Sequence, residues 1–160
     1  MNTRSLIAIA AGGSAALLLG AYGFQALGYA PCKMCLWQRW PHFAAIGIGI
    51  LGLLILPRPF ALLGALAAAT TAGLGIFHTG VERGWWEGPT SCTGSGPGLG
   101  GLSGGDLLST DAPRLVMCDQ VSWAFAGLSM ASWNAIFSLA LVAIWLVAAT
   151  RTGRSGVSVW

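Results

Sequence analysis

The four cysteines of this chain form two unlike pairs. Cys32 and Cys35 make a C-x-x-C motif, whereas Cys92 and Cys118 lie far apart in the sequence. A C-x-x-C motif is typical of thiol–disulfide exchange, but two structural disulfides, one disulfide with a stray pair, or a four-sulfur zinc site would also use four cysteines. The second pair lacks zinc-knuckle spacing, so zinc is the weaker of these alternatives. The residue types therefore favour redox chemistry.

The neighbours of the C-x-x-C motif favour reactive thiols. Pro31 suits the first turn of a helix, so we expect a helix that starts there and holds both thiols in its first turn. The helix dipole and the cations Lys33 and Arg39 would stabilise thiolate over thiol. Cys35, Arg39 and His42 would share one helix face, where an electron acceptor could dock. Arg39 could also anchor the helix at a membrane surface, and the two roles are compatible.

The composition places these residues in a membrane protein. The chain is 55% hydrophobic and 8% charged, beyond the roughly 45–50% apolar content of soluble domains. Four uncharged stretches could each cross a bilayer, and the first is longer than the core of a cleaved signal peptide. We therefore predict an all-α membrane protein, a four-transmembrane-helix bundle forming one domain over residues 1–160. The predicted spans are 6–27, 38–56, 60–80 and 125–149, with two extracytoplasmic loops at 28–37 and 81–124.

The arginines predict the orientation. If both termini are cytoplasmic, the inner segments carry Arg4, Arg58, Arg151 and Arg154 and no acidic residue, as the positive-inside rule describes. All four cysteines then lie outside. The net charge of +3 follows from this topology and does not indicate nucleic-acid binding.

The second outer loop combines two kinds of sequence. Seven glycines between Gly94 and Gly105 predict a flexible stretch without a core of its own. Residues Asp106 to Met117 could form a short amphipathic helix on the membrane, although Pro113 interrupts it.

Two segments carry a family resemblance. They are Pro31-Cys32-Lys33-Met34-Cys35-Leu36-Trp37-Gln38-Arg39, and the segment after Cys118 with Trp123, Phe125, Gly127-Leu128-Ser129-Met130 and Trp133-Asn134. Together with the order of spans, they resemble the disulfide bond formation protein B (DsbB) family over nearly the whole chain. Two features depart from the family pattern. Lys33 puts a charge where many relatives have an apolar residue or proline, and the glycine-rich run after Cys92 differs from the best-known members of the family.

The resemblance implies a location, a partner and an electron acceptor. The protein would be a multi-pass enzyme of the bacterial inner membrane, in contact with lipid. It would reoxidise a DsbA-like periplasmic thioredoxin-fold protein and reduce a membrane quinone, with ubiquinone the expected type. No metal and no nucleic acid would take part.

The resemblance also implies roles for single residues. Cys92 and Cys118 would form the disulfide that accepts electrons, with Cys92 making the mixed disulfide. Cys118 would exchange with Cys32, and Cys35 would pass electrons to the quinone through a charge-transfer contact. Arg39 would hold the quinone. His78 resembles a family histidine linked to the quinone site, although an interfacial histidine bonded to backbone is an equal alternative.

Two other functions stay open at this point. A vitamin K epoxide reductase-like enzyme would also be a small quinone-linked bundle, but its C-x-x-C belongs near the end of the chain. A non-enzymatic membrane scaffold would use the disulfides only to staple its outer loops. Cycling of Cys32 and Cys35 with quinone supply would separate the scaffold from the enzyme.

Overall fold

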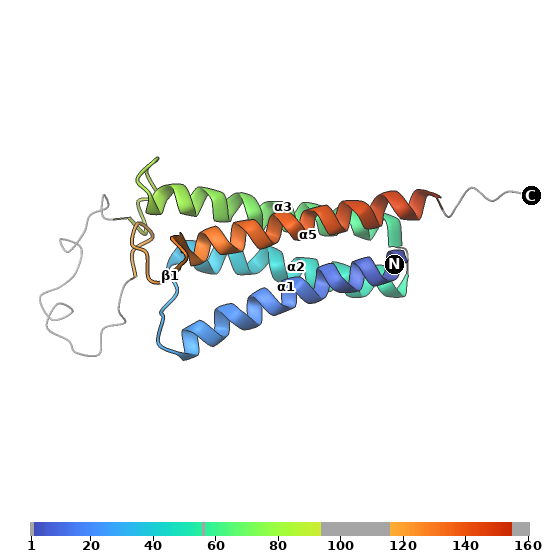
Figure 1. Ribbon diagram of the computed structural model, residues 1–160, viewed down its shortest axis with the longest axis horizontal. Coiled ribbons are helices and arrows are strands. Elements are labelled where there is room, and N and C mark those ends of the chain that lie inside the picture. Colours follow the sequence, from blue (N-terminus) through green and yellow to red (C-terminus); the bar gives the residue numbers. More distant parts are fainter. Residues whose placement is uncertain (1, 56, 94–115, 155–160) are drawn as a thin grey trace, which may run out of the picture.

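Four long helices form an up-and-down bundle, each antiparallel to the next along the chain, in the computed structural model, which describes residues 2–55, 57–93 and 116–154 (Figure 1). They are α1 (Thr3–Ala26), α2 (Lys33–Leu54), α3 (Pro57–Glu82) and α5 (Met130–Arg154). A short antiparallel hairpin, β1 (Ala124–Phe125) with β2 (Leu128–Ser129), precedes α5. The described parts of the chain begin and finish at one end of the bundle, and the hairpin lies at the opposite end.

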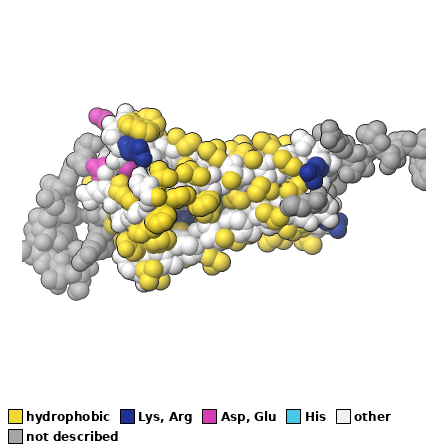
Figure 2. Space-filling model, in the orientation of Figure 1, with side chains coloured by type: hydrophobic (Ala, Val, Ile, Leu, Met, Phe, Trp, Pro, Cys, Tyr) yellow, Lys and Arg dark blue, Asp and Glu magenta, His cyan; other side chains and the backbone are white. Residues whose placement is uncertain are grey.

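Three of the helices are long and apolar enough to cross a membrane. These segments are Thr3–Ala26, Pro59–Glu82 and Met130–Arg151. α2 is long but carries Gln38, Arg39 and His42 in its first half. Large apolar side chains are exposed along the middle of the bundle, as a lipid-facing surface requires, and Lys and Arg side chains lie toward its ends (Figure 2).

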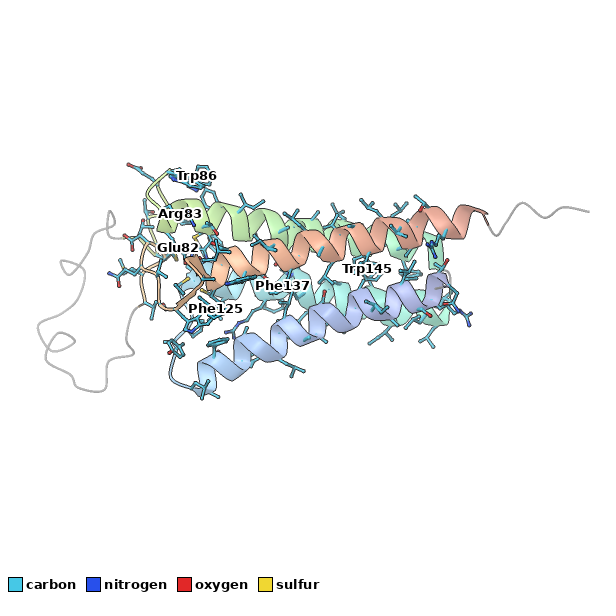
Figure 3. All side chains as sticks on the ribbon, viewed as in Figure 1. Glu82, Arg83, Trp86, Phe125, Phe137 and Trp145 are labelled. Carbon is cyan, nitrogen blue, oxygen red and sulfur yellow. A yellow bond between two sulfur atoms is a disulfide. The ribbon has the colours of Figure 1, made fainter. Side chains whose placement is uncertain are left out.

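Small residues let the helices approach closely at the end that holds the chain termini. The core there contains Ala10, Ala61, Ala65 and Ala68, packed around the fully buried Trp145 (Figure 3). Close packing of small residues is how membrane helices associate without a hydrophobic driving force. The helices are thus locked together at this end, far from the cysteines.

The structure differs from the sequence-based expectations at several boundaries. α2 begins at Lys33 with Cys32 as its N-cap, so Cys32 precedes the first turn that was expected to hold it. The hairpin was not predicted; it turns through Ala126 and Gly127, which both have positive φ. Most of the expected helix from Asp106 to Met117 and the glycine-rich run lie outside the described residues, and the described residues 116–117 are not helical.

The packing around Trp145 predicts opposite effects of one substitution at two glycines of α3. A Cβ at Gly64 would lie 2.6 Å from the Trp145 ring, whereas a Cβ at Gly73 meets nothing within 4 Å. Both changes to Ala gain roughly 1 kcal/mol of helix propensity. We expect Gly64→Ala to destabilise the protein by about 1–3 kcal/mol through overpacking and Gly73→Ala to be neutral or stabilising. Unfolding in detergent micelles measures both, and equal stability of the two variants would contradict this packing.

Candidate active site

Cys32 stands where the backbone of α2 offers unpaired donors. Its backbone is extended, and its sulfur accepts a hydrogen bond from the Cys35 N–H at 3.2 Å. Capping of this kind satisfies one of the orphan N–H groups at a helix start and favours a negative charge there. A thiolate is therefore stabilised at Cys32 by the beginning of the helix itself.

The Cys32 and Cys35 sulfurs lie 2.9 Å apart as free thiols that share a hydrogen bond. The Cys32 sulfur also lies 3.5 Å from His78 Nε2. The hydrogen bond with the Cys35 side chain, followed by the hydrogen bond and charge of His78, lowers the pKa of the Cys32 thiol to about 4 against the opposing effect of burial. The dithiol thus carries its negative charge on Cys32, and Cys35 keeps the shared proton.

Cys92 and Cys118 form a disulfide that packs against the first pair. One apolar cluster contains Cys32, Cys92 and Cys118, with Cys35 at its edge. Cys92 is 6% exposed and Cys118 is fully buried, so the second pair does not extend into solvent. A hydrogen bond of 3.0 Å from Lys33 Nζ to Ser91 Oγ ties the neighbouring loop to the start of α2.

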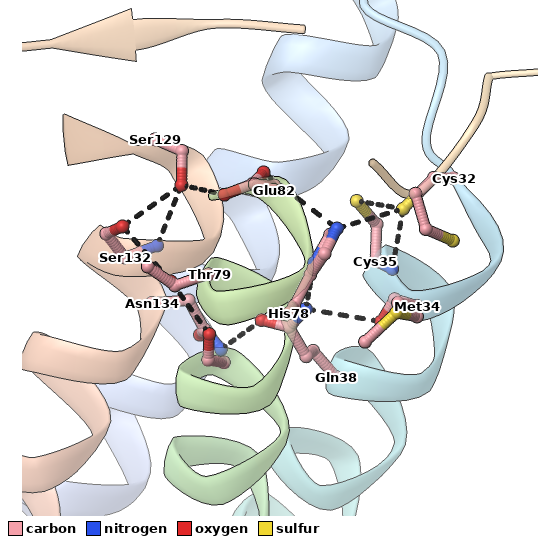
Figure 4. Close-up of polar contacts among 12 residues, drawn as sticks. Cys32, Met34, Cys35, Gln38, His78, Thr79, Glu82, Ser129, Ser132 and Asn134 are labelled. Atoms are coloured by element: carbon pink, nitrogen blue, oxygen red, sulfur yellow. Dashed lines mark hydrogen bonds and ion pairs between the residues drawn. The ribbon is translucent and has the colours of Figure 1, made fainter. Parts of the chain in front are cut away.

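His78 joins the cysteines to a buried polar network (Figure 4). Gln38 Nε2 donates to the Met34 carbonyl at 3.2 Å and lies 2.9 Å from His78 Nδ1. When His78 is neutral, Nδ1 accepts from Gln38 and the proton is on Nε2, which faces Cys32. Glu82 lies 3.9 Å from the same Nε2, and Ser129 donates to its carboxylate. The thiolate, the imidazole and the carboxylate are therefore neighbours in one chain of contacts.

A pocket of about 410 Å³ opens beside these groups. Its walls come from all four helices and the hairpin, and they are mostly apolar. Figure 3 labels two of its aromatic side chains, Phe125 and Phe137. The polar side chains that line it include Cys35, Arg39 and His42. This volume and lining are those of a site for a small, largely apolar molecule.

Two nitrogen atoms of residues that line this pocket have no hydrogen-bond partner among the described residues. They are Arg39 Nε and His42 Nδ1. Arg39 is otherwise held by Gln25 Oε1 at 2.9 Å and by the Tyr22 ring, whose centroid lies 4.5 Å from its guanidinium carbon. Unpaired buried polar atoms are uncommon in folded proteins, and at the wall of a pocket a bound molecule is one source of the partner.

The site residues expected from the sequence come together at one end of the bundle. Cys32, Cys35, Arg39 and His78 all line the pocket, and the Cys92–Cys118 disulfide adjoins Cys32. Ligand atoms of Cys32, Cys35 and His78 also lie within 4.8 Å of one another, so these three could hold a metal ion.

Sequence reasoning gave no role to Gln38, Glu82, Asn134 and Ser129. Glu82 had a signal, since it lies one helical turn after His78 and could have been paired with it. Gln38, Ser129 and Asn134 all stand in the segments that carry the family resemblance. Ser129 needs the hairpin to reach Glu82, and no sequence pattern indicated that contact.

The fold and the site define a helical protein of membrane-spanning type that holds a disulfide and a dithiol side by side at one end of its bundle. The sequence matches the family described as "Disulfide bond formation protein DsbB" over residues 3–148. It is similar to Disulfide bond formation protein B of Aromatoleum aromaticum, with 29% identity covering 94% of this chain and 92% of that protein. The protein of the same name from Azoarcus sp. strain BH72 is 30% identical, covering 94% of this chain and 95% of that protein. No solved structure matches the chain significantly.

The chain belongs to the DsbB family. It is therefore a multi-pass membrane protein of disulfide bond formation, with a disulfide oxidoreductase role.

The charge assigned to Cys32 gives a titration prediction. The ultraviolet absorbance of thiolate in the reduced protein should fall with a midpoint near pH 4 as acid is added, because the folded pKa is depressed from its ordinary value of 9.0. The stability that this thiolate contributes is fully present above pH 9.0 and is lost as the pH falls through about 4.

Two variants of Cys35 test the cause of that shift. Cys35→Ser keeps a donor beside Cys32, whereas Cys35→Ala removes it. The midpoint should rise clearly more in the Ala variant than in the Ser variant. A midpoint in Cys35→Ala equal to that of the wild-type protein would show that the Cys35 side chain does not stabilise the thiolate.

Proposed function

We propose that this protein reoxidises a DsbA-like periplasmic thioredoxin-fold dithiol protein and passes the electrons to a membrane quinone, with ubiquinone the expected acceptor. It would do so in the bacterial inner membrane with four spans, cytoplasmic termini and periplasmic cysteines. α2 would be the fourth span. Its second half presents exposed Ile50, Leu51 and Leu54, and its polar first half faces the bundle. The arginine distribution supports this orientation.

One observation carries the proposal: the disulfide and the dithiol lie in one cluster at the wall of an apolar pocket. A scaffold protein that used its cysteines only for structural disulfides would not require a thiolate at a helix start beside a histidine. A vitamin K epoxide reductase-like arrangement is disfavoured because the C-x-x-C begins the second helix of this chain.

The exchange steps balance as follows. A thiolate of the partner attacks Cys92, forming a mixed disulfide and releasing Cys118. Cys118 attacks Cys32 of an oxidised Cys32–Cys35 pair, forming a Cys118–Cys32 disulfide and releasing Cys35. The second partner thiol displaces Cys92, which then attacks Cys118 and releases Cys32. The partner leaves oxidised, and Cys32 and Cys35 hold its two electrons and two protons.

The arrangement of the structure, with Cys92–Cys118 oxidised and Cys32 and Cys35 reduced, corresponds to the end of this sequence. A quinone supplies an acceptor for two electrons and two protons. Such an acceptor is needed because DsbA is a strong thiol oxidant, with a known potential of about −120 mV, which few thiol couples can reoxidise.

The residues of the pocket fit a quinone. Arg39 carries only donors and has an unpaired Nε, so it would hold a quinone oxygen and stabilise negative charge there. His78 would hold the Cys32 thiolate and take part in proton transfer with Glu82. The apolar walls would exclude water and accept the ring.

A quinone-reduction assay tests the proposal. The purified protein, a reduced DsbA-like donor and decylubiquinone should give quinone loss that depends on both the donor and the protein. Changing Cys32, Cys35, Cys92 or Cys118 singly to Ser should abolish it, because each takes part in an exchange. Full activity in any one of these variants would exclude the relay. Quinone-independent, permanently oxidised cysteines would favour the scaffold.

Arg39→His tests the acceptor site separately. The shorter side chain loses the guanidinium, so the KM for decylubiquinone should rise about tenfold or more, the loss expected for a charge-assisted hydrogen bond of about 1.5–3 kcal/mol. The Cys32–Cys35 redox state set by the DsbA-like donor should stay unchanged without quinone. An unchanged KM would remove Arg39 from the site.

A further inference from the structure

His42 is a buried group of the pocket that the proposed relay does not use. It lies one turn after Arg39 on α2, is 3% exposed and lines the pocket. Its Nε2 is bonded to Asn134, and its Nδ1 has no partner among the described residues. Which of the two nitrogens carries the proton decides what the pocket can recognise at this point.

A chain of hydrogen bonds fixes that proton. The Met34 carbonyl can only accept, so it orients the Gln38 amide with Nε2 toward it and Oε1 away. Gln38 Oε1 in turn accepts from Asn134 Nδ2 at 2.7 Å. This turns Asn134 Oδ1 toward His42 Nε2 at 2.9 Å, and because Oδ1 can only accept, Nε2 must donate.

Thr71 gives an independent check on this tautomer. Its hydroxyl donates to the backbone carbonyl of Gln38 at 3.1 Å and accepts from Asn134 Nδ2 at 3.1 Å. Its oxygen therefore presents lone pairs to His42 Nε2, 3.3 Å away. Both neighbours of Nε2 are acceptors, so in the neutral imidazole Nε2 carries the proton and Nδ1 is a bare acceptor.

We infer that His42 Nδ1 accepts a hydrogen bond from a hydroxyl group of the reduced acceptor, a hydroquinone, and so makes the pocket prefer hydroquinone to quinone. The inference rests on the proposed function and concerns the same pocket. A quinone has carbonyl oxygens and no donor, which leaves Nδ1 unpaired, whereas a hydroquinone hydroxyl pairs it. Arg39, with donors only, serves the oxygens of either form.

This preference has a cost as well as a benefit. A bound hydroquinone that pairs Nδ1 is favoured over quinone by about two- to tenfold, the range that one net hydrogen bond provides. The equilibrium constant for electron transfer from Cys32 and Cys35 to the bound quinone rises by the same factor, and release of the hydroquinone product is slowed. His42 thus acts as a specificity-determining residue of the pocket.

The binding test uses His42→Gln. The Gln side chain is longer than that of Asn, so its amide nitrogen can replace His42 Nε2 and donate to Asn134 Oδ1, but it leaves no acceptor at the Nδ1 position. Decylubiquinone is titrated into the oxidised protein, and its reduced quinol into the reduced protein under anaerobic conditions, so that neither pairing can exchange electrons. Tryptophan fluorescence quenching reports both affinities. The matched control is Ser138→Ala. Ser138 does not line the pocket, and its hydroxyl donates to Asn134 Oδ1 at 3.5 Å, so this variant removes a different hydrogen bond to the same Asn134 oxygen.

We expect His42→Gln to lose about two- to tenfold in quinol affinity with little change for quinone, and Ser138→Ala to keep the wild-type ratio. An unchanged ratio in His42→Gln overturns the inference. If the wild-type protein binds neither compound, the proposed function itself fails. If the wild-type protein binds both compounds and His42→Gln has the same ratio of quinol to quinone affinity, the proposed function stands and the role of His42 does not.

A second measurement does not depend on the variant being folded. The chain has only two histidines, so ¹⁵N NMR of the histidine-labelled wild-type protein in detergent resolves each ring nitrogen. His42 should show a protonated Nε2 and an unprotonated Nδ1, and the Ser138→Ala variant should show the same. A protonated Nδ1 in the wild-type protein would overturn the inference directly.

Discussion

The negative charge held at the start of α2 is the interaction on which the rest of the site depends. Cys32 receives the Cys35 N–H from its own helix and faces His78 from α3. The first contact requires that α2 begin at Lys33, and the second requires that α3 reach the same height in the bundle. The backbone is extended at Cys32 itself, immediately before the helix begins. Without this charge the C-x-x-C pair would be two ordinary thiols in an apolar cluster.

Buried polar groups are expensive inside an apolar bundle, and here they satisfy one another across three helices. Gln38 of α2, His78 of α3 and Asn134 of α5 form the centre of the network. α1 joins the polar region through Gln25 and Tyr22, both of which contact Arg39. Its close apolar packing is at the other end, and Figure 1 shows it diverging from α5 toward the cysteines. The pocket lies where α1 diverges from α2, α3 and α5, the three helices that the Gln38, His78 and Asn134 side chains join together.

The sequence was sufficient for what is local and periodic. The apolar stretches predicted the long helices, and the spacing of Cys35, Arg39 and His42 predicted their shared face. It was insufficient where contacts join distant parts of the chain. Helical periodicity cannot show that the Cys92–Cys118 disulfide is buried against Cys32, or that a hairpin brings Ser129 to Glu82. For His78 it left two roles equal, and the structure shows bonds to side chains of α2 that only tertiary packing supplies.

The burial of the second pair changes what a relay would demand of the loop. The relay requires Cys118 to reach Cys32, and the two residues already belong to one cluster. The groups that must move are instead those that cover Cys92, since only 6% of it is exposed to an incoming thiolate. The Lys33–Ser91 bond near it is exposed and easily replaced by water. Local opening at Cys92, with Cys118 held beside Cys32, would therefore admit the partner without separating the two cysteines that must exchange.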